Sequence, residues 1–209
     1  MRIRPFELGS FLSMSYVAAA EGGREAVVID PGEGPEPILE YLAAESLTAA
    51  AILNTHGHGD HIAGNTAVKA AFPDAPILIG EADAPMLTDP TANLSALFGL
   101  SFVSPPANRL LRDGERVELA GLGIECRLVP GHSPGQMIFY LPAEGVCFCG
   151  DTVFAGSIGR SDFPGGDAAV LLEAIRGRIL SLPPDTRLYP GHGPPTTVGR
   201  EAAANPFLG

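Results

Sequence analysis

The chain has 209 residues, of which 45% are hydrophobic and 18% are charged, and this balance is enough for one compact domain with a substantial core. No apolar run reaches the roughly 18 residues needed to cross a bilayer, which excludes a transmembrane helix and gives no reason to expect a membrane partner. The net charge of −11 would repel a phosphate backbone, and no Lys/Arg cluster compensates, so nucleic acid is not expected as a partner.

The three cysteines, Cys126, Cys147 and Cys149, form an odd number inside apolar runs. This pattern argues against a disulfide framework and for a reducing compartment, so we expect a cytoplasmic protein. Residues 1–21 have some features of a signal peptide, but a proline, a glutamate and three serines interrupt the apolar region. The alternation of residue types there favours an opening strand.

The first half of the chain predicts alternating strands and helices. Buried strands are expected at 26–29, 50–54 and 76–80, and helical spacing is found at 37–44 and 61–72. Residues 85–106 contain apolar side chains without a sustained period. They predict either a loop or short helix that covers a site, or a segment that only fills space in the packing.

The second half is richer in strands. Short runs separated by Gly or Pro predict strands at 115–119, 123–129, 136–141, 146–149 and 186–189, with one helix at 168–182. Two halves that each contain a sheet and helices predict a mixed α/β (α+β) fold, with helix, sheet, sheet and helix stacked as a four-layer αββα sandwich.

The run from Asn54 to His61, N-T-H-G-H-G-D-H, has four potential metal ligands at a junction between strand and helix. The ligands are His56, His58, Asp60 and His61. Imidazole and carboxylate groups bind zinc or iron, and we expect the glycines between them to let the backbone turn sharply enough for the ligands to converge.

The remaining histidines lie in similar turns that follow predicted strands. His132 lies in P-G-H-S-P-G and His192 in P-G-H-G-P, while Asp151 follows an apolar run in C-G-D. Side chains at the ends of neighbouring strands point into one cleft along a sheet edge. A lone histidine is more often structural, but that explanation does not account for all five histidines in such places.

The succession H-x-H-x-D-H, G-H-S-P-G, G-D and G-H-G resembles the metallo-β-lactamase superfamily across nearly the whole chain. The resemblance implies two divalent metal ions and the αββα fold. It implies that the first ion is held by His56, His58 and His132, the second by Asp60, His61 and His192, and that Asp151 bridges them. Zinc is the expected metal for mixed His/Asp ligands, and iron or manganese tolerates the same set.

Thr55, the stretch G-S-I-G-R-S-D-F-P-G-G-D at 156–167 and the ending at 190–207 look like the single-domain bacterial type II glyoxalases, also called hydroxyacylglutathione hydrolases. This resemblance implies one domain over 1–209, without the C-terminal helical domain that grips glutathione in two-domain relatives. It implies a small-molecule thioester substrate, an S-acylglutathione. Arg160 stands near the position of a glutathione-binding lysine and is the candidate substrate-binding residue, although a salt bridge within its own loop explains it equally well.

Hydrolysis of a thioester fits such a centre. Metal binding lowers the pKa of water from about 15.7 to about 7, so a hydroxide that bridges the metals could attack the acyl carbonyl without a histidine base. Asp60 is the expected catalytic residue, because it could orient this hydroxide by accepting a hydrogen bond. The leaving thiolate, with a conjugate acid of pKa about 8.5, needs no general acid.

Other activities remain open on the same ligands. A persulfide dioxygenase shares the fold and uses one iron, which His56, His132 and Asp151 would hold here. A lactonase would use the same ligands on a cyclic ester, and a non-catalytic metal-binding module is less consistent with a complete set of seven ligands. β-Lactamases of the commonest subclass carry a cysteine where Asp151 lies and lack a histidine at position 61, so both positions argue against that activity.

Overall fold

The computed structural model describes residues 1–209 and contains two six-stranded sheets. The first sheet has the spatial order β1 (Arg2–Leu8), β2 (Ser13–Ala19), β3 (Glu25–Ile29), β4 (Thr48–Leu53), β5 (Ile77–Gly80) and β6 (Arg109–Leu111). Its first three strands pair antiparallel, and the pairs from β3 to β6 are parallel. The N-terminal half of the chain therefore builds one whole sheet.

The second sheet belongs to the C-terminal half. Its order is β14 (Thr196–Thr197), β13 (Arg187–Pro190), β10 (Val146–Gly150), β9 (Met137–Leu141), β8 (Leu122–Leu128) and β7 (Arg116–Leu119). Only β10 and β13 pair in parallel. A small hairpin of β11 (Val153–Phe154) and β12 (Ser157–Ile158) follows β10.

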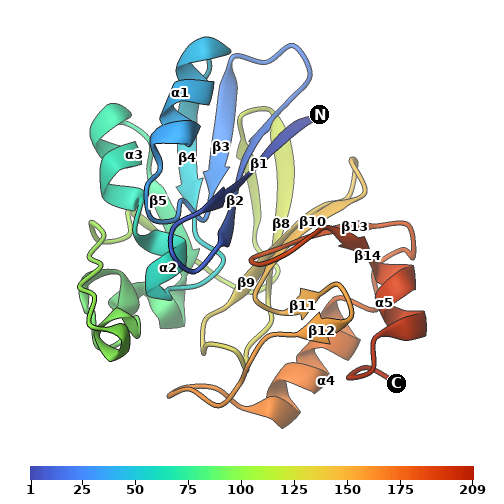
Figure 1. Cartoon of the computed structure of the whole chain (residues 1–209). Coiled ribbons are helices and arrows are strands. Elements are labelled where there is room, and N and C mark those ends of the chain that lie inside the picture. Colours follow the sequence, from blue (N-terminus) through green and yellow to red (C-terminus); the bar gives the residue numbers. More distant parts are fainter.

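Helices cover the outer faces of both sheets. They are α1 (Glu36–Ala44), α2 (Gly59–Ile62), α3 (Asn65–Ala71), α4 (Ala168–Arg178) and α5 (Val198–Ala204), with two 3₁₀ helices, η1 (Glu81–Thr88) and η2 (Ser95–Phe98). Figure 1 shows α1 and α3 outside the first sheet, and α4 and α5 on the opposite side of the molecule. None of these helices combines the length and apolar character needed to span a membrane.

Buried side chains divide into three clusters that define four layers. In β3, Val27 and Ile29 face the second sheet, whereas Ala26 and Val28 pack with α1 and α3. Because successive residues of a strand point to opposite faces, a strand buried on both sides reads as a continuous apolar run. This is why the strand at 26–29 was predictable from composition alone.

The second sheet repeats this arrangement. Phe139 and Phe148 enter the cluster between the sheets, while Ile138 and Cys147 pack against Leu171 of α4. The cluster between the sheets thus links the two halves of the chain, and each sheet carries its own helix layer. The predicted αββα sandwich is confirmed.

Several predicted boundaries were wrong. The helix predicted at 61–72 is split into α2 and α3, because the Gly64 N–H donates to the Pro31 carbonyl oxygen at 2.8 Å and not to the preceding turn. The helix predicted at 168–182 ends at Arg178. Strand β2, strand β6 and helix α5 were not predicted, and 85–106 contains the end of η1 and all of η2.

Replacing Phe139 with alanine tests the position of the core. Phe139 is fully buried between the sheets, so the variant should lose about 3–5 kcal/mol of unfolding free energy, measured by urea denaturation. The control is Phe207→Ala, because Phe207 is 52% exposed; its effect should stay within about 0.5 kcal/mol. Similar losses in the two variants would contradict this assignment of the core.

Candidate metal centre

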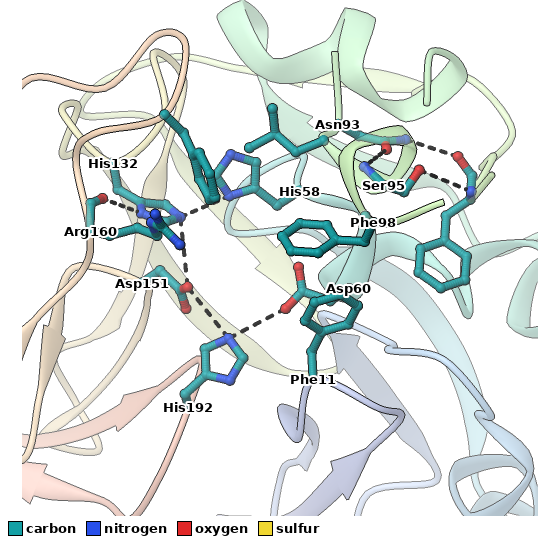
Figure 2. Close-up of a pocket in the computed structure, with 14 residues that line it drawn as sticks. Phe11, His58, Asp60, Asn93, Ser95, Phe98, His132, Asp151, Arg160 and His192 are labelled. Carbon is teal, nitrogen blue, oxygen red and sulfur yellow. Dashed lines mark hydrogen bonds and ion pairs between the residues drawn. The ribbon is translucent and has the colours of Figure 1, made fainter. Parts of the chain in front are cut away.

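The seven predicted ligands converge where strands of both sheets end. The 54–61 loop follows β4, and His132, Asp151 and His192 follow β8, β10 and β13. The sheets are joined at this edge, since the Met137 N–H donates to the Thr55 carbonyl oxygen at 2.7 Å. Figure 2 shows His132, Asp151, His192 and Asp60 around one common space. The site therefore lies between the halves of the sandwich.

Three imidazoles form a first group. His132 Nε2 lies 3.3 Å from His56 Nε2 and 2.9 Å from His58 Nδ1. Nitrogen atoms about 2.0–2.1 Å from one tetrahedral zinc ion lie about 3.3–3.4 Å apart. The spacing of His56, His58 and His132 is therefore close to that of ligands around a single ion, and the three residues form one candidate metal-binding group.

A second group combines one carboxylate and two imidazoles. Asp60 Oδ2 lies 3.2 Å from His61 Nε2 and 3.3 Å from His192 Nε2. These atoms are as closely spaced as those of the first group, and the three residues form a second candidate metal-binding group.

Asp151 lies between the two groups. Its Oδ2 is 3.6 Å from His132 Nε2 and 3.5 Å from His192 Nε2, while its Oδ1 is 3.5 Å from His61 Nε2. A single carboxylate thus reaches both groups, which is the position that a bridging ligand requires.

The chemistry of the donor atoms fits metal ions. The buried atoms without a hydrogen-bond partner include His61 Nε2 and Asp151 Oδ1, which lie 3.5 Å apart and face the other predicted ligands. Leaving such atoms unpaired costs free energy, and an ion is one of the few ways to satisfy them. The donor atoms present therefore fit bound metal ions.

Burial keeps His56 and His58 of the first group neutral. The pKa of His56 is far below its usual value, chiefly because burial disfavours the charged ring, and the same effect lowers the pKa of His58 to about 3. Neutral imidazole is the form that binds metals. Both side chains therefore offer lone pairs at neutral pH.

The second group has the opposite electrostatic character. Burial lowers the pKa of His61, but the carboxylates of Asp60 and Asp151 outweigh burial and hold it well above its usual value. Burial also lowers the pKa of His192, but the same two carboxylates raise it above its usual value. The carboxylates thus draw positive charge to this position, and a divalent cation would take the place of the protons.

Hydrogen bonds orient two of the rings. The ring Nδ1 of His132 lies 2.7 Å from the Arg160 carbonyl oxygen, which only a protonated Nδ1 can satisfy, and this contact directs Nε2 toward His56 and His58. Asp30 accepts from the Thr55 N–H at 2.7 Å and from Thr55 Oγ1 at 2.6 Å. Thr55 Oγ1 lies 3.1 Å from His56 Nδ1, so Asp30 steadies the first ligand through Thr55.

Asp83 was missed by the sequence analysis. This carboxylate in η1 is fully buried, and it accepts from the Gly57 N–H at 3.1 Å, from Ser133 Oγ at 2.6 Å and from the Gly135 N–H at 2.6 Å. Gly57 lies in the ligand loop of the first sheet, and Ser133 follows His132 in the second. Asp83 therefore holds together the two loops that carry the first group.

Strand β2 also supports the centre. Ser13 Oγ donates to Asp60 Oδ2 at 2.7 Å, which fixes the carboxylate that belongs to the second group. The Met14 N–H donates to the Gly191 carbonyl oxygen at 2.7 Å, and the Tyr16 hydroxyl donates to the Pro190 carbonyl oxygen at 2.6 Å. The turn that carries His192 is thus tied to the opposite sheet.

The glycines of the ligand loop have a different role from the predicted one. Neither Gly57 nor Gly59 adopts a positive φ, so a sharp turn is not the reason for them. A Cβ atom at Gly57 would lie 2.6 Å from Met86 Cβ, and one at Gly59 would lie 2.9 Å from Ser95 Cβ. Close packing against η1 and η2 excludes any side chain at these positions.

A cavity of about 290 Å³ opens onto the metal ligands. It is lined by five of the predicted ligand residues, His58, Asp60, His132, Asp151 and His192, and by residues of the 85–106 segment. The expectation that this segment covers a site is therefore met in part, because its side chains form one wall of the pocket. The volume is at the lower limit for small-molecule sites.

Arg160 lines the same pocket but has a partner in its own loop. Its Nε and one terminal nitrogen donate to the two carboxylate oxygens of Asp162 at 2.8 and 2.9 Å, and its guanidinium lies 3.6 Å from the centre of the Phe163 ring. The side chain is thus positioned at the pocket while its charge is balanced by Asp162.

Asp83→Ala should loosen the metal centre. Loss of the three hydrogen bonds frees the two ligand loops, and metal affinity should fall about 10- to 100-fold, as for other supporting residues of metal sites. Competition with a chelator measures the change. Asp185→Ala, at an exposed aspartate, is the matched control. Equal affinity in Asp83→Ala and the unmodified protein would refute the role of Asp83.

Comparison with known proteins gives a consistent result. The model of the metallo-beta-lactamase superfamily matches residues 9–192. An uncharacterized Mycobacterium tuberculosis protein, Rv2581c, is 38% identical, with 100% of this chain and 98% of the relative covered. The probable metallo-hydrolase YqgX of Bacillus subtilis is 32% identical over the same shares. Hydroxyacylglutathione hydrolase GloC of Haemophilus influenzae is 35% identical, covering 88% of each chain.

Solved structures show the same relationship. BLEG-1 B3 metallo-beta-lactamase gives a TM-score of 0.95 at 38% identity and 99% coverage of both chains. TTHA1623 in a di-iron-bound form gives a TM-score of 0.88 at 40% identity, with 98% of this chain and 100% of TTHA1623 covered. ETHE1 from Myxococcus xanthus gives a TM-score of 0.82 at 26% identity, with 99% of this chain and 84% of ETHE1 covered. This chain therefore belongs to the metallo-beta-lactamase superfamily of metallo-hydrolases.

Proposed function

We propose that this protein hydrolyses thioesters of the S-acylglutathione type at a centre of two divalent metal ions. The observation that carries the proposal is the position of Asp151, within 3.6 Å of ring nitrogens in both ligand groups. One carboxylate shared by two complete groups supports a centre of two ions. The similarity to GloC of Haemophilus influenzae supports the choice of substrate class.

The proposed ligand sets follow the two groups. The first ion would be held by His56, His58 and His132, the second by Asp60, His61 and His192, with Asp151 between them. Zinc suits mixed nitrogen and oxygen donors, and iron or manganese accepts the same donors. The di-iron form of TTHA1623 supports a two-metal centre on this fold.

Bound ions would supply an acidified water and polarise the substrate carbonyl. Asp60 is the proposed catalytic residue, because Ser13 and the two neighbouring histidines fix its Oδ2 while the carboxylate reaches into the pocket (Figure 2). It would accept a hydrogen bond from the attacking water. The water oxygen then bonds to the acyl carbon, the C–S bond breaks with its electron pair on sulfur, and a carboxylic acid and a thiol are formed.

The chemistry of the leaving group supports a thioester substrate. A thiol has a pKa of about 8.5, so its thiolate leaves without a proton donor, whereas an amide nitrogen needs one. Among the residues that line the pocket, the side chains able to carry a proton are the proposed ligands and Arg160, whose pKa is raised by its contacts with Asp162. None of them is a suitable acid for a basic nitrogen.

Two further proposals concern the setting of the enzyme. We propose that residues 1–209 act as one domain, because a single cluster of apolar residues is shared by both sheets. We also propose a cytoplasmic location, because Cys126, Cys147 and Cys149 are all buried free thiols.

A persulfide dioxygenase is the second candidate, because His56, His132 and Asp151 are the residues that would hold its single iron. A single iron would use His132 and Asp151 among its three ligands. His132 Nε2 lies 3.6 Å from Asp151 Oδ2. The complete second group argues against it, because Asp60, His61 and His192 would have no ion to bind. A count of metal ions per chain separates the two candidates.

Purified protein should contain two metal ions per chain and hydrolyse S-lactoylglutathione. Chelation should abolish the activity, and return of zinc, iron or manganese should restore it, because the ions activate the water. Elemental analysis and release of glutathione measure the two quantities. One iron per chain, oxygen consumption with glutathione persulfide and no thioester hydrolysis would establish the dioxygenase instead. Preference for a β-lactam over the thioester would also overturn the proposal.

Arg160→Ala should raise KM for S-lactoylglutathione about tenfold with a smaller change in kcat, if the guanidinium binds a glutathione carboxylate. Asp162→Ala should lower KM, since it releases Arg160 to the substrate. Arg176→Ala, at an exposed arginine of α4, is the control for charge alone. If Arg160 only stabilises its loop, the Arg160 and Asp162 variants will instead raise KM together.

A further inference from the structure

The pocket wall beside Asp60 is apolar. Phe11 and Phe98 meet edge to face, with ring centres 5.1 Å apart and an interplanar angle of 77°. Figure 2 shows both rings next to Asp60. Together with Leu94 and Phe102, these residues line the cavity from the 85–106 segment and from the turn before β2, and we call the four the aromatic wall.

Two polar residues beside the aromatic wall, Asn93 and Ser95, use their side-chain hydrogen-bonding groups within the protein. The Asn93 side-chain amide donates to the carbonyl oxygens of Met86 and Phe102, and its oxygen accepts from the Ser95 N–H. The Ser95 hydroxyl is bonded to Pro90 and Phe102. A ligand group on this side therefore meets carbon surface and not hydrogen-bonding groups.

The cationic end of the pocket lies elsewhere. The Arg160 carbonyl oxygen is 2.7 Å from His132 Nδ1, which places this residue beside the first ligand group, whereas Phe11 and Phe98 lie beside Asp60 of the second (Figure 2). A substrate whose carbonyl lies over the ligands thus has two different surroundings. A carboxylate-bearing thiol portion fits the Arg160 end, and the acyl portion fits the aromatic wall.

Part of the aromatic wall is open to a ligand. Phe98 is 52% exposed and Phe11 and Phe102 are partly exposed, whereas Leu94 is buried. Burial of exposed aromatic area by an apolar ligand is favourable in proportion to the area covered. A methyl group, such as that of a lactoyl group, covers little of this surface, whereas an aryl group covers much more of it.

We propose that the protein selects acyl groups with a bulky apolar substituent, such as phenyl, which bind against Phe11 and Phe98. This inference rests on the proposed thioester hydrolysis and deepens it by naming the acyl class. Phe98 and Phe11 are then specificity-determining residues, and the metal ligands are common to all substrates.

The test uses two thioesters that differ only in the group of interest. The glutathione thioesters of 2-hydroxy-2-phenylacetic acid and of lactic acid share the leaving group and the α-hydroxyl, and the first has phenyl where the second has methyl. In the metal-loaded protein, kcat/KM should be about tenfold higher for the phenyl substrate, within the range that apolar pockets achieve. An equal or lower value would overturn the proposal.

Substitution of the two rings tests whether they cause the preference for the phenyl substrate. Phe98→Ala, and separately Phe11→Ala, should reduce the ratio of kcat/KM for the phenyl substrate to that for the lactoyl substrate about tenfold. Phe207→Ala is the matched control, because Phe207 is also 52% exposed and does not line the pocket. A preference for phenyl that survives in both wall variants would show that these rings do not determine it.

A binding measurement separates this inference from the proposed function. The thioethers S-(2-oxo-2-phenylethyl)glutathione and S-(2-oxopropyl)glutathione cannot be hydrolysed, and calorimetry should show about tenfold tighter binding of the phenyl compound, lost in Phe98→Ala. If neither thioester is hydrolysed but this difference is found, thioester hydrolysis is wrong and the apolar selectivity stands. Equal binding of the two thioethers would overturn the selectivity even if both thioesters are hydrolysed.

Discussion

The structure depends on one constraint, the burial of many lone pairs at a single place. Five imidazoles and two carboxylates converge where the sheets meet, and several of their buried atoms have no hydrogen-bond partner. Such a cluster is unfavourable by itself, because buried polar atoms without partners cost free energy. Positive charge at the centre removes that cost. The surrounding loops have to hold the lone pairs in place until a cation arrives.

The supporting hydrogen bonds connect the two halves of the chain. Asp83 and Asp30 accept backbone and hydroxyl protons from the ligand loops, Ser13 donates to Asp60, and Met14 of β2 reaches across to the turn of His192. The ligands are thus fixed by contacts between the sheets as well as within them. Metal affinity and the packing of the two sheets are therefore coupled in this fold.

The sequence was sufficient for the layers and for the convergence of the predicted ligands, because both follow from simple rules. Continuous apolar runs such as 26–29 indicate strands buried on both faces, and polar residues after the strand ends share one edge. It was not sufficient for β2, since S-M-S-Y-V-A-A mixes serines with apolar residues although all seven are buried. Asp83 could not be distinguished from Glu81 two residues earlier, because only tertiary contacts make one of the acids structural. The close packing at Gly57 was hidden for the same reason.

The segment between β5 and β6 carries two roles, one in each of its 3₁₀ helices. Asp83 in η1 is buried and bonded to both ligand loops, whereas Phe98 in η2 is half exposed and belongs to the pocket wall. A change at residue 98 would therefore alter the pocket wall without disturbing the contacts that assemble the ligands. This separation allows new substrate preferences to arise by single substitutions at the tip of the segment, while the hydrolytic centre beneath it stays intact.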